Sequence, residues 1–177
     1  MSLLTAIVGT PVAESGVWQH VETQVLASPA ASVSFTGLVP SPFFRLTAYI
    51  QNDANVKAVF IRFNNDSAGN YVRQQISASS TSVAGTRDTA QTQIQPDLSP
   101  ALAASQASSF GFIFAKPSAG VKAQAVGQMG FNASPVLALT GGEWNNTADL
   151  ISRIDVLASS NNFAAGTSIR LDKKDAS

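Results

Sequence analysis

The chain has 177 residues, no cysteine, and 11 Lys and Arg against 11 Asp and Glu. Only 12% of its residues are charged, which is about half the usual share. The length suits one domain with a substantial core, and the lack of cysteine excludes disulfides and thiolate metal sites. A neutral chain without a basic stripe argues against nucleic acid or an anionic membrane as a partner. Its uncharged polar surface costs little to desolvate, which favours contact with neighbouring subunits.

Residues 1–16 are expected to form an N-terminal arm. They contain a short apolar run with no basic residue before it, so they match neither a membrane span nor a signal peptide. Pro11 and Gly16 separate this arm from residues 17–177, which we expect to form a single domain.

Short β-branched or alternating runs, each closed by a turn signal, predict the strands of this domain. The first five are Val17–Leu26, Ala31–Gly37, Phe43–Gln51, Val56–Phe63 and Tyr71–Ile76. After a gap, the runs Phe110–Phe114, Val121–Phe131, Val136–Leu139, Ile151–Leu157 and Thr167–Leu171 follow, with a turn expected at 140–142. Roughly ten short strands without a long helix predict an all-β fold, an antiparallel sandwich or barrel.

The gap at about 77–109 is rich in Ser, Thr, Ala and Gln and has few large apolar side chains. We interpret it as a polar excursion from the sheet, with a brief strand at Thr92–Ile94. Ser99 and Pro100 resemble a helix cap and a first-turn proline, which indicate one or two short helical turns.

The polar turn after Val56–Phe63 has two interpretations. Asn64, Asn65, Asp66 and Asn70 are typical of a tight hairpin turn, because Asn and Asp tolerate left-handed backbone and bond their own main chain. The same oxygens suit calcium or a sugar, but EF-hand spacing is absent. We favour the hairpin, and we expect no metal and no cofactor.

Catalytic candidates are few. His20 is the single histidine, and the chain has no nucleophile elbow to go with it. A glycosidase needs two facing carboxylates, and the sequence neither excludes nor favours a pair such as Glu22 and Glu143. We therefore expect a protein that is not an enzyme.

Aromatic side chains that stack on sugar rings are the usual means of carbohydrate recognition. The Trp and Tyr residues available for this are Trp18, Tyr49, Tyr71 and Trp144. We favour core or interface positions for them, because large aromatics bury most of their area in sheets. Partner or glycan contacts remain open at Trp18 and Trp144, and in the turn at Asn64, Asn65, Asp66 and Asn70.

Three stretches carry a family resemblance. The segment Ser32–Leu38 contains Phe35 and Gly37, and the hairpin from Val56 runs through Phe63 to Tyr71. The third stretch, Gly142–Thr167, holds an Asn-Phe-x-x-Gly-Thr unit with Phe163 and Gly166. Together they resemble a group of bacteriophage virion β-sandwich proteins, although the charged end after Leu171 departs from the group's pattern. We expect these residues to be framework, with Phe163 closing one end of the sandwich and Gly166 at positive φ.

The resemblance implies a jelly-roll-like sandwich on the outer surface of a phage capsid or tail. Because the domain fills most of the chain without a fibrous shaft, a capsid decoration (cement) protein is favoured. Its implied partners are the major capsid protein or other virion proteins and further copies of itself, with a trimer favoured. The alternative is a tail or fibre-tip module that binds host surface carbohydrate. A depolymerase ranks third.

Overall fold

The computed structural model describes residues 16–54, 58–79, 81–96, 107–131 and 136–175. These residues form eleven strands, which pair antiparallel throughout: β1 (Gln19–Val25), β2 (Ser32–Phe35), β3 (Phe43–Gln51), β4 (Val59–Phe63), β5 (Tyr71–Ser79), β6 (Ser82–Gln91), β7 (Ala107–Ala115), β8 (Ala123–Phe131), β9 (Val136–Trp144), β10 (Ile154–Ala158) and β11 (Ser168–Lys174). No helix in the described part of the chain is long and apolar enough to cross a membrane.

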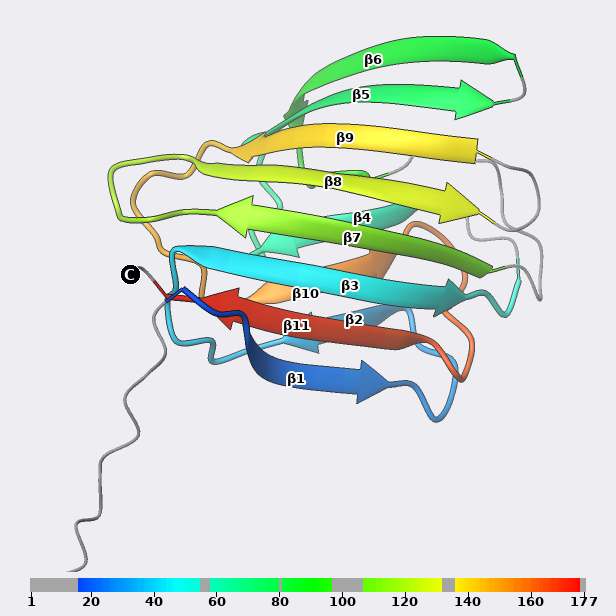
Figure 1. Ribbon diagram of the computed structural model, residues 1–177, viewed down its shortest axis with the longest axis horizontal. Coiled ribbons are helices and arrows are strands. Elements are labelled where there is room, and N and C mark those ends of the chain that lie inside the picture. The colour runs from blue at the N-terminus through cyan, green and yellow to red at the C-terminus, as the bar shows by residue number, and fades with distance from the viewer. Residues whose placement is uncertain (1–15, 55–57, 80, 97–106, 132–135, 176–177) are drawn as a thin grey trace, which may run out of the picture.

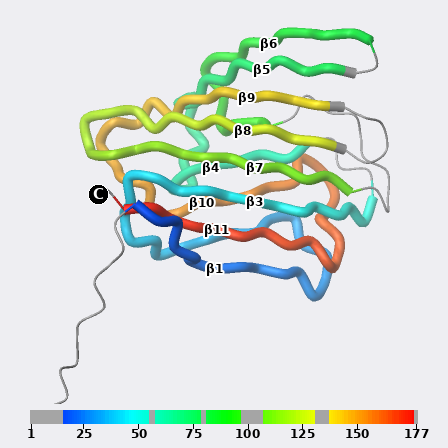
Figure 2. The backbone as a smooth tube through the Cα atoms, viewed as in Figure 1, coloured from blue at the N-terminus to red at the C-terminus, as the bar shows by residue number. Residues whose placement is uncertain are grey.

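The strands form two sheets that pack face to face. The large sheet has eight strands in the order β1-β11-β3-β7-β8-β9-β5-β6, and the small sheet has three in the order β2-β10-β4. Figure 1 shows β2, β10 and β4 behind the large sheet, with β5 and β6 at one side, and Figure 2 traces the same path. The expected all-β, jelly-roll-like antiparallel sandwich is confirmed.

The core lies between the sheets because the strands alternate. Along β3, Phe44, Leu46, Ala48 and Ile50 are buried, whereas Thr47 between them is exposed. A strand places successive side chains on opposite faces, so one face of the large sheet joins the core and the other faces away from it.

The three stretches that carry the family resemblance supply the whole small sheet. Its central strand, β10, pairs with β2 on one side and β4 on the other, so that Ile154 lies opposite both Phe35 and Phe63. All three side chains are fully buried. Segments far apart in the sequence therefore meet in one layer, and Phe35 and Phe63 are framework residues as expected.

The hairpin turn after β4 has the predicted left-handed backbone, with φ of 52° at Asn64 and 54° at Asn65. The Oδ1 of Asn64 accepts the N–H groups of Ser152 at 2.9 Å and Arg153 at 3.0 Å. Its Nδ2 donates to the carbonyl oxygen of Leu150 at 2.8 Å. The Asn64 side chain thus binds the turn to the chain that leads into β10.

Tyr71 closes the same hairpin from the other strand. Its hydroxyl accepts the N–H of Phe63 at 2.9 Å and lies 3.2 Å from the carbonyl oxygen of Phe63, to which it donates. The ring is fully buried and stacks on Trp144, with centroids 6.4 Å apart. Burial raises the pKa of Tyr71 far above its ordinary value, which keeps the hydroxyl protonated as the donor.

The other framework predictions are also confirmed. Phe163 is fully buried, and its backbone exchanges hydrogen bonds with Ala30 at one end of the sandwich. Gly166 has a φ of 88° and Gly37 a φ of 65°, in the region that side chains other than glycine rarely adopt.

The interpretation of 77–109 as an excursion is wrong for the part that the structure describes. β5 continues to Ser79, and β6 is a ten-residue strand at the edge of the large sheet. The sequence pattern missed β6 because all its side chains are exposed or half-buried, so neither face carries an apolar series. The strand expected at 92–94 is a single bridge between Ile94 and Ile61.

One further expectation is wrong, and two others concern residues that the structure does not describe. The turn predicted at 140–142 does not exist, because β9 runs straight through it to Trp144. Gly142 there makes room for the side chain of Ile94, which would lie 3.1 Å from an added Cβ atom. The helical turns near Ser99 and Pro100 and residues 1–15 of the arm lie outside the described residues.

Candidate functional site

The face of the large sheet that points away from the small sheet carries exposed apolar side chains. We call five of them the outer patch: Ile76 on β5, Ile113 on β7, Val126 on β8, and Leu137 and Leu139 on β9. Their exposed fractions range from 41% at Ile113 to 63% at Val126. Large apolar side chains gathered on one exposed face mark an interaction surface, whereas single scattered ones do not.

Strand register brings the members of the outer patch together. Ile76 lies directly opposite Leu139 across the β5–β9 pair, and Val126 lies opposite Ile113 across the β7–β8 pair. Residues paired in this way point to the same face, with Cβ atoms only about 5 Å apart. The patch therefore spans four neighbouring strands.

Glycines alternate with these side chains on the same face. Gly111 and Gly130 would have nothing within 4 Å of an added Cβ atom, and Gly141 only the backbone oxygen of Gln74 at 3.9 Å. Gly127 points inward instead, where a Cβ atom would overlap the Phe112 ring. The inward glycine is required by the core, but the three outward ones leave space that the fold itself does not use.

Shallow troughs occupy that space. One of about 350 Å³ lies between Ile113, Val126 and Leu139, and another of about 420 Å³ lies between Ile76, Val126 and Leu139. The outer patch is thus a surface of alternating apolar ridges and hollows.

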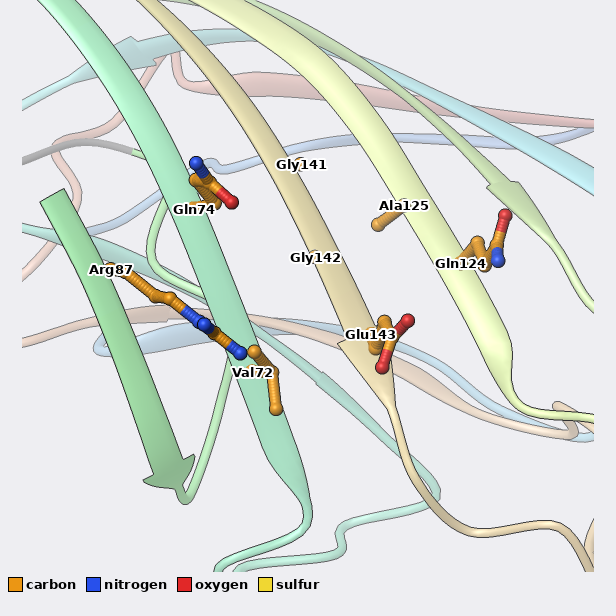
Figure 3. A pocket seen from close by; sticks show the side chains of 8 residues that line it. All are labelled: Val72, Gln74, Arg87, Gln124, Ala125, Gly141, Gly142 and Glu143. Carbon is orange, nitrogen blue, oxygen red and sulfur yellow. The ribbon is translucent and has the colours of Figure 1, made fainter. Parts of the chain in front are cut away.

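A third trough, of about 460 Å³, lies at one end of the outer patch and is more polar. Figure 3 shows Gly141 and Gly142 along its floor, Arg87 reaching over from β6, and Glu143 on β9. Glu143 is ion-paired with Lys122 at 3.3 Å, and both side chains are substantially exposed. Exposed pairs of this kind contribute little stability, so these groups remain available to a partner.

On the same outer face, β3 and β11 carry an ion cluster, on the side of the outer patch away from β5. Asp172 is almost fully buried between Arg45 at 3.0 Å and Arg170 at 2.8 Å. Burial opposes ionisation of Asp172, but hydrogen bonds from the two arginines outweigh it and lower the pKa of the carboxyl. Arg45 also lies over the Trp18 ring, 4.7 Å from its centroid.

The structure corrects the proposal of Trp144 as a contact residue. Its side chain is fully buried, so it cannot stack on a sugar or touch a partner. Its indole N–H donates at 2.7 Å to Asp66, which also accepts from Asn70 at 2.9 Å and from the N–H of Ala68 at 2.9 Å. Burial alone would raise the pKa of Asp66, but these hydrogen bonds lower it.

The remaining predicted contacts divide between structure and surface. Asn64 and Asn70 are half-buried and bonded within the hairpin, whereas Asn65 is exposed at its tip. Trp18 is half-buried beneath Arg45. The predicted loop is therefore mainly framework, with Asn65 its most exposed predicted contact, and Trp18 is partly accessible.

No carboxylate pair forms between Glu22 and Glu143. Glu22 lies on β1 and Glu143 on β9, with four strands between them. At about 4.8 Å per step, they are roughly 24 Å apart, far beyond the separation of about 5 to 9.5 Å that glycosidases use. The described residues also contain no group of three or more His, Asp or Glu placed to hold a metal ion.

Sequence reasoning did not find the outer patch. The run Phe110–Phe114 is apolar throughout, so its pattern does not distinguish Ile113, which points outward, from the core side chains beside it. The sequence did carry a signal for it. In β7 and in β8, apolar residues occur at both odd and even positions, so each face of the strand carries some of them, and glycine occupies several outward positions.

Comparison with solved structures gives distant likenesses. No protein-family model matches the sequence, and no curated protein matches it. An alginate lyase solved with an alginate tetrasaccharide is 8% identical, with a TM-score of 0.34 over 88% of this chain and 80% of that one. A protein of unknown function from Shewanella oneidensis is 11% identical, with a TM-score of 0.22 over 92% and 78%. Scores this low carry no argument about function.

Proposed function

We propose that the protein is a non-enzymatic structural component of a bacteriophage virion, a capsid decoration protein that stabilises the head through contacts between subunits. The observation that carries the proposal is the small sheet. The three stretches that resemble phage virion sandwich proteins form its three strands, and their signature residues hold it together.

Hairpin residues that carry the resemblance make contacts that stabilise the fold. Phe63 fills the core, Asn64 binds the chain before β10, Asp66 accepts the indole N–H of Trp144, and Tyr71 closes the turn on Phe63. A resemblance confined to scattered surface positions would arise easily by chance. One that falls on mutually bonded framework residues supports a shared fold and, with it, the same structural role.

The outer face supports an assembling protein as well. Its exposed side chains are apolar or uncharged at the centre, and the charged side chains Arg45, Arg87 and Glu143 stand around them. An apolar centre with a polar rim is the usual anatomy of a subunit interface.

The alternative, a module that binds host carbohydrate, is favoured by the polar trough of Figure 3. Gln74, Gln124, Arg87 and Glu143 line it with donors and acceptors suited to sugar hydroxyls. The alternative therefore moves from Trp144 to this trough. Binding of host polysaccharide that is lost in Arg87→Ala would favour it over capsid decoration.

The direct experiment is co-sedimentation with capsids of the encoding phage that lack the protein. We expect saturable binding at a ratio to the major capsid protein that matches sites of the capsid lattice, and added resistance of the head to heat. Capsids that sediment without the protein at every concentration would contradict the proposal.

A further inference from the structure

The outer patch raises the question of what covers it. We propose that a second copy of this chain packs on it face to face, about a two-fold axis that runs parallel to the strands between β8 and β9. The proposal deepens the structural role proposed above, because it names the subunit contact that the outer face makes.

The first argument is the pattern of ridges and hollows. Across the β8–β9 pair, Val126 lies opposite Gly141, and Leu137 lies opposite Gly130. In the proposed dimer β8 faces β9 of the second copy. Val126 then comes over Gly141 of that copy, and Leu137 comes over its Gly130.

The pattern continues on the neighbouring strands. Ile76, Leu139, Gln128 and Gly111 follow one another in a row across β5, β9, β8 and β7. The same axis places β5 over β7 of the second copy, so Ile76 comes over its Gly111, while Leu139 comes over the exposed side chain of its Gln128. Twist turns packed sheets by about 30°, so the match is closest at the axis, beside Val126 and Gly141.

The second argument is that no contact within the single chain requires glycine at the hollows. Added Cβ atoms at Gly111 and Gly130 would meet nothing within 4 Å, so the fold would accept a side chain there. Glycine weakens a strand relative to other residues. Glycine at these outward positions is explained if a side chain of the second copy occupies the hollow.

The third argument is area. β3, β5, β7, β8 and β9 are each nine residues long. Five such strands cover about 24 by 30 Å, or roughly 700 Å² per copy. Stable interfaces bury about 600–1,000 Å² per partner, so the face is within the range that holds a dimer.

Charged side chains lie only at the rim of the packed face. Glu143 has its own partner in Lys122, and it comes over the uncharged Gln124 of the second copy. Arg87 comes over Arg45 of the second copy, a like-charge contact at the rim, where Asp172 offsets only part of the charge that Arg45 and Arg170 carry. The centre of the interface contains only apolar side chains, glycine and glutamine.

The test uses a compensating pair of substitutions in the purified protein. By light scattering after gel filtration, we expect wild type at about twice the chain mass of 18.4 kDa. Gly141→Val fills the hollow, where an added Cβ atom meets only the Gln74 backbone oxygen at 3.9 Å, and should raise the dimer Kd at least about tenfold. Adding Val126→Gly to Gly141→Val exchanges ridge and hollow, and should restore the dimer.

Since the chain has no cysteine, single cysteines give a second readout. Facing sheets lie about 10 Å apart, which is beyond the reach of a disulfide. Mixing Val126→Cys protein with Gly141→Cys protein should therefore yield a cross-linked heterodimer with a short thiol-to-thiol bismaleimide. Val39→Cys is the matched control, because Val39 is 69% exposed but lies between β2 and β3. It should not cross-link with either protein.

Three results would overturn the proposal: a wild-type monomer at high concentration, an oligomer that Gly141→Val leaves unchanged, or a trimer without the Val126–Gly141 cross-link. Because no capsid is present, these results are separate from the co-sedimentation experiment. Failure here would leave the capsid proposal standing with a different subunit contact.

Discussion

Asp66 shows how one side chain can unite two distant parts of this fold. Its carboxylate accepts hydrogen bonds from Trp144, Asn70 and the N–H of Ala68. The sequence predicted a turn at this place and left a ligand loop open, since the same oxygens suit both. What it could not indicate was the bond to Trp144, because 78 residues separate the two side chains.

Asp66→Asn tests this role. The amide keeps the shape of the side chain but turns one acceptor oxygen into a donor, which opposes the indole or Asn70 donor. We expect a loss of about 1–3 kcal/mol in the free energy of unfolding, measured by urea titration. Ser67→Ala, an exposed change in the same turn, is the control and should stay within about 0.5 kcal/mol.

The pKa of Asp66 gives this stability a pH dependence. The folded-state pKa lies below the ordinary value of 3.8, so the contribution is present above that pH and is lost as pH falls through the folded pKa. Asp172 behaves in the same way. We expect the unfolding free energy of wild type to fall between about pH 5 and pH 2. Asp66→Asn should flatten that slope, and an unchanged slope would contradict the assignment.

The glycines of β8 and β9 differ by the face on which they lie. An alanine at 127 would overlap the Phe112 ring and the carbonyl oxygen of Gly111, whereas one at 141 meets only Gln74 oxygen at 3.9 Å. We expect Gly127→Ala to cost about 1–3 kcal/mol of unfolding free energy. In protein dilute enough to be monomeric, Gly141→Ala should be neutral or stabilising, by thermal or chemical denaturation. Equal effects would show that the outward hollow is not free.

At the scale of strands, alternation and turn residues were enough to predict most of the sheet. Phe43–Gln51 was expected and observed with the same bounds, because its buried and exposed side chains alternate. β6 was missed, since a strand exposed on both faces has no apolar series to identify it. The outer patch was missed for the opposite reason, because Ile113 is hidden in a run of core phenylalanines.

The exposed position of β6 predicts where the sheet opens first. Within the described residues it pairs with β5 alone, and few of its side chains are covered. We expect backbone amides of β6 to exchange hydrogen faster than those of β3 and β7, which have strands on both sides. Hydrogen exchange followed by mass spectrometry would show this. Protection of β6 equal to that of β3 would indicate that another chain covers its edge.

For the whole molecule, we propose that the two sheets have different roles. The small sheet holds the residues that resemble phage virion proteins, and the outer face of the large sheet offers a surface for a second copy. Composition pointed toward assembly through its low charge. It could not say which face assembles, because that depends on the register of β5, β7, β8 and β9.

The measurement that tests the virion proposal most directly is the copy number of the protein in purified particles of the encoding phage, by quantitative mass spectrometry. A decoration protein predicts a fixed, high number that is a simple ratio to the major capsid protein. Absence from the particles would contradict a structural role. A handful of copies per particle would place the protein on the tail and contradict capsid decoration.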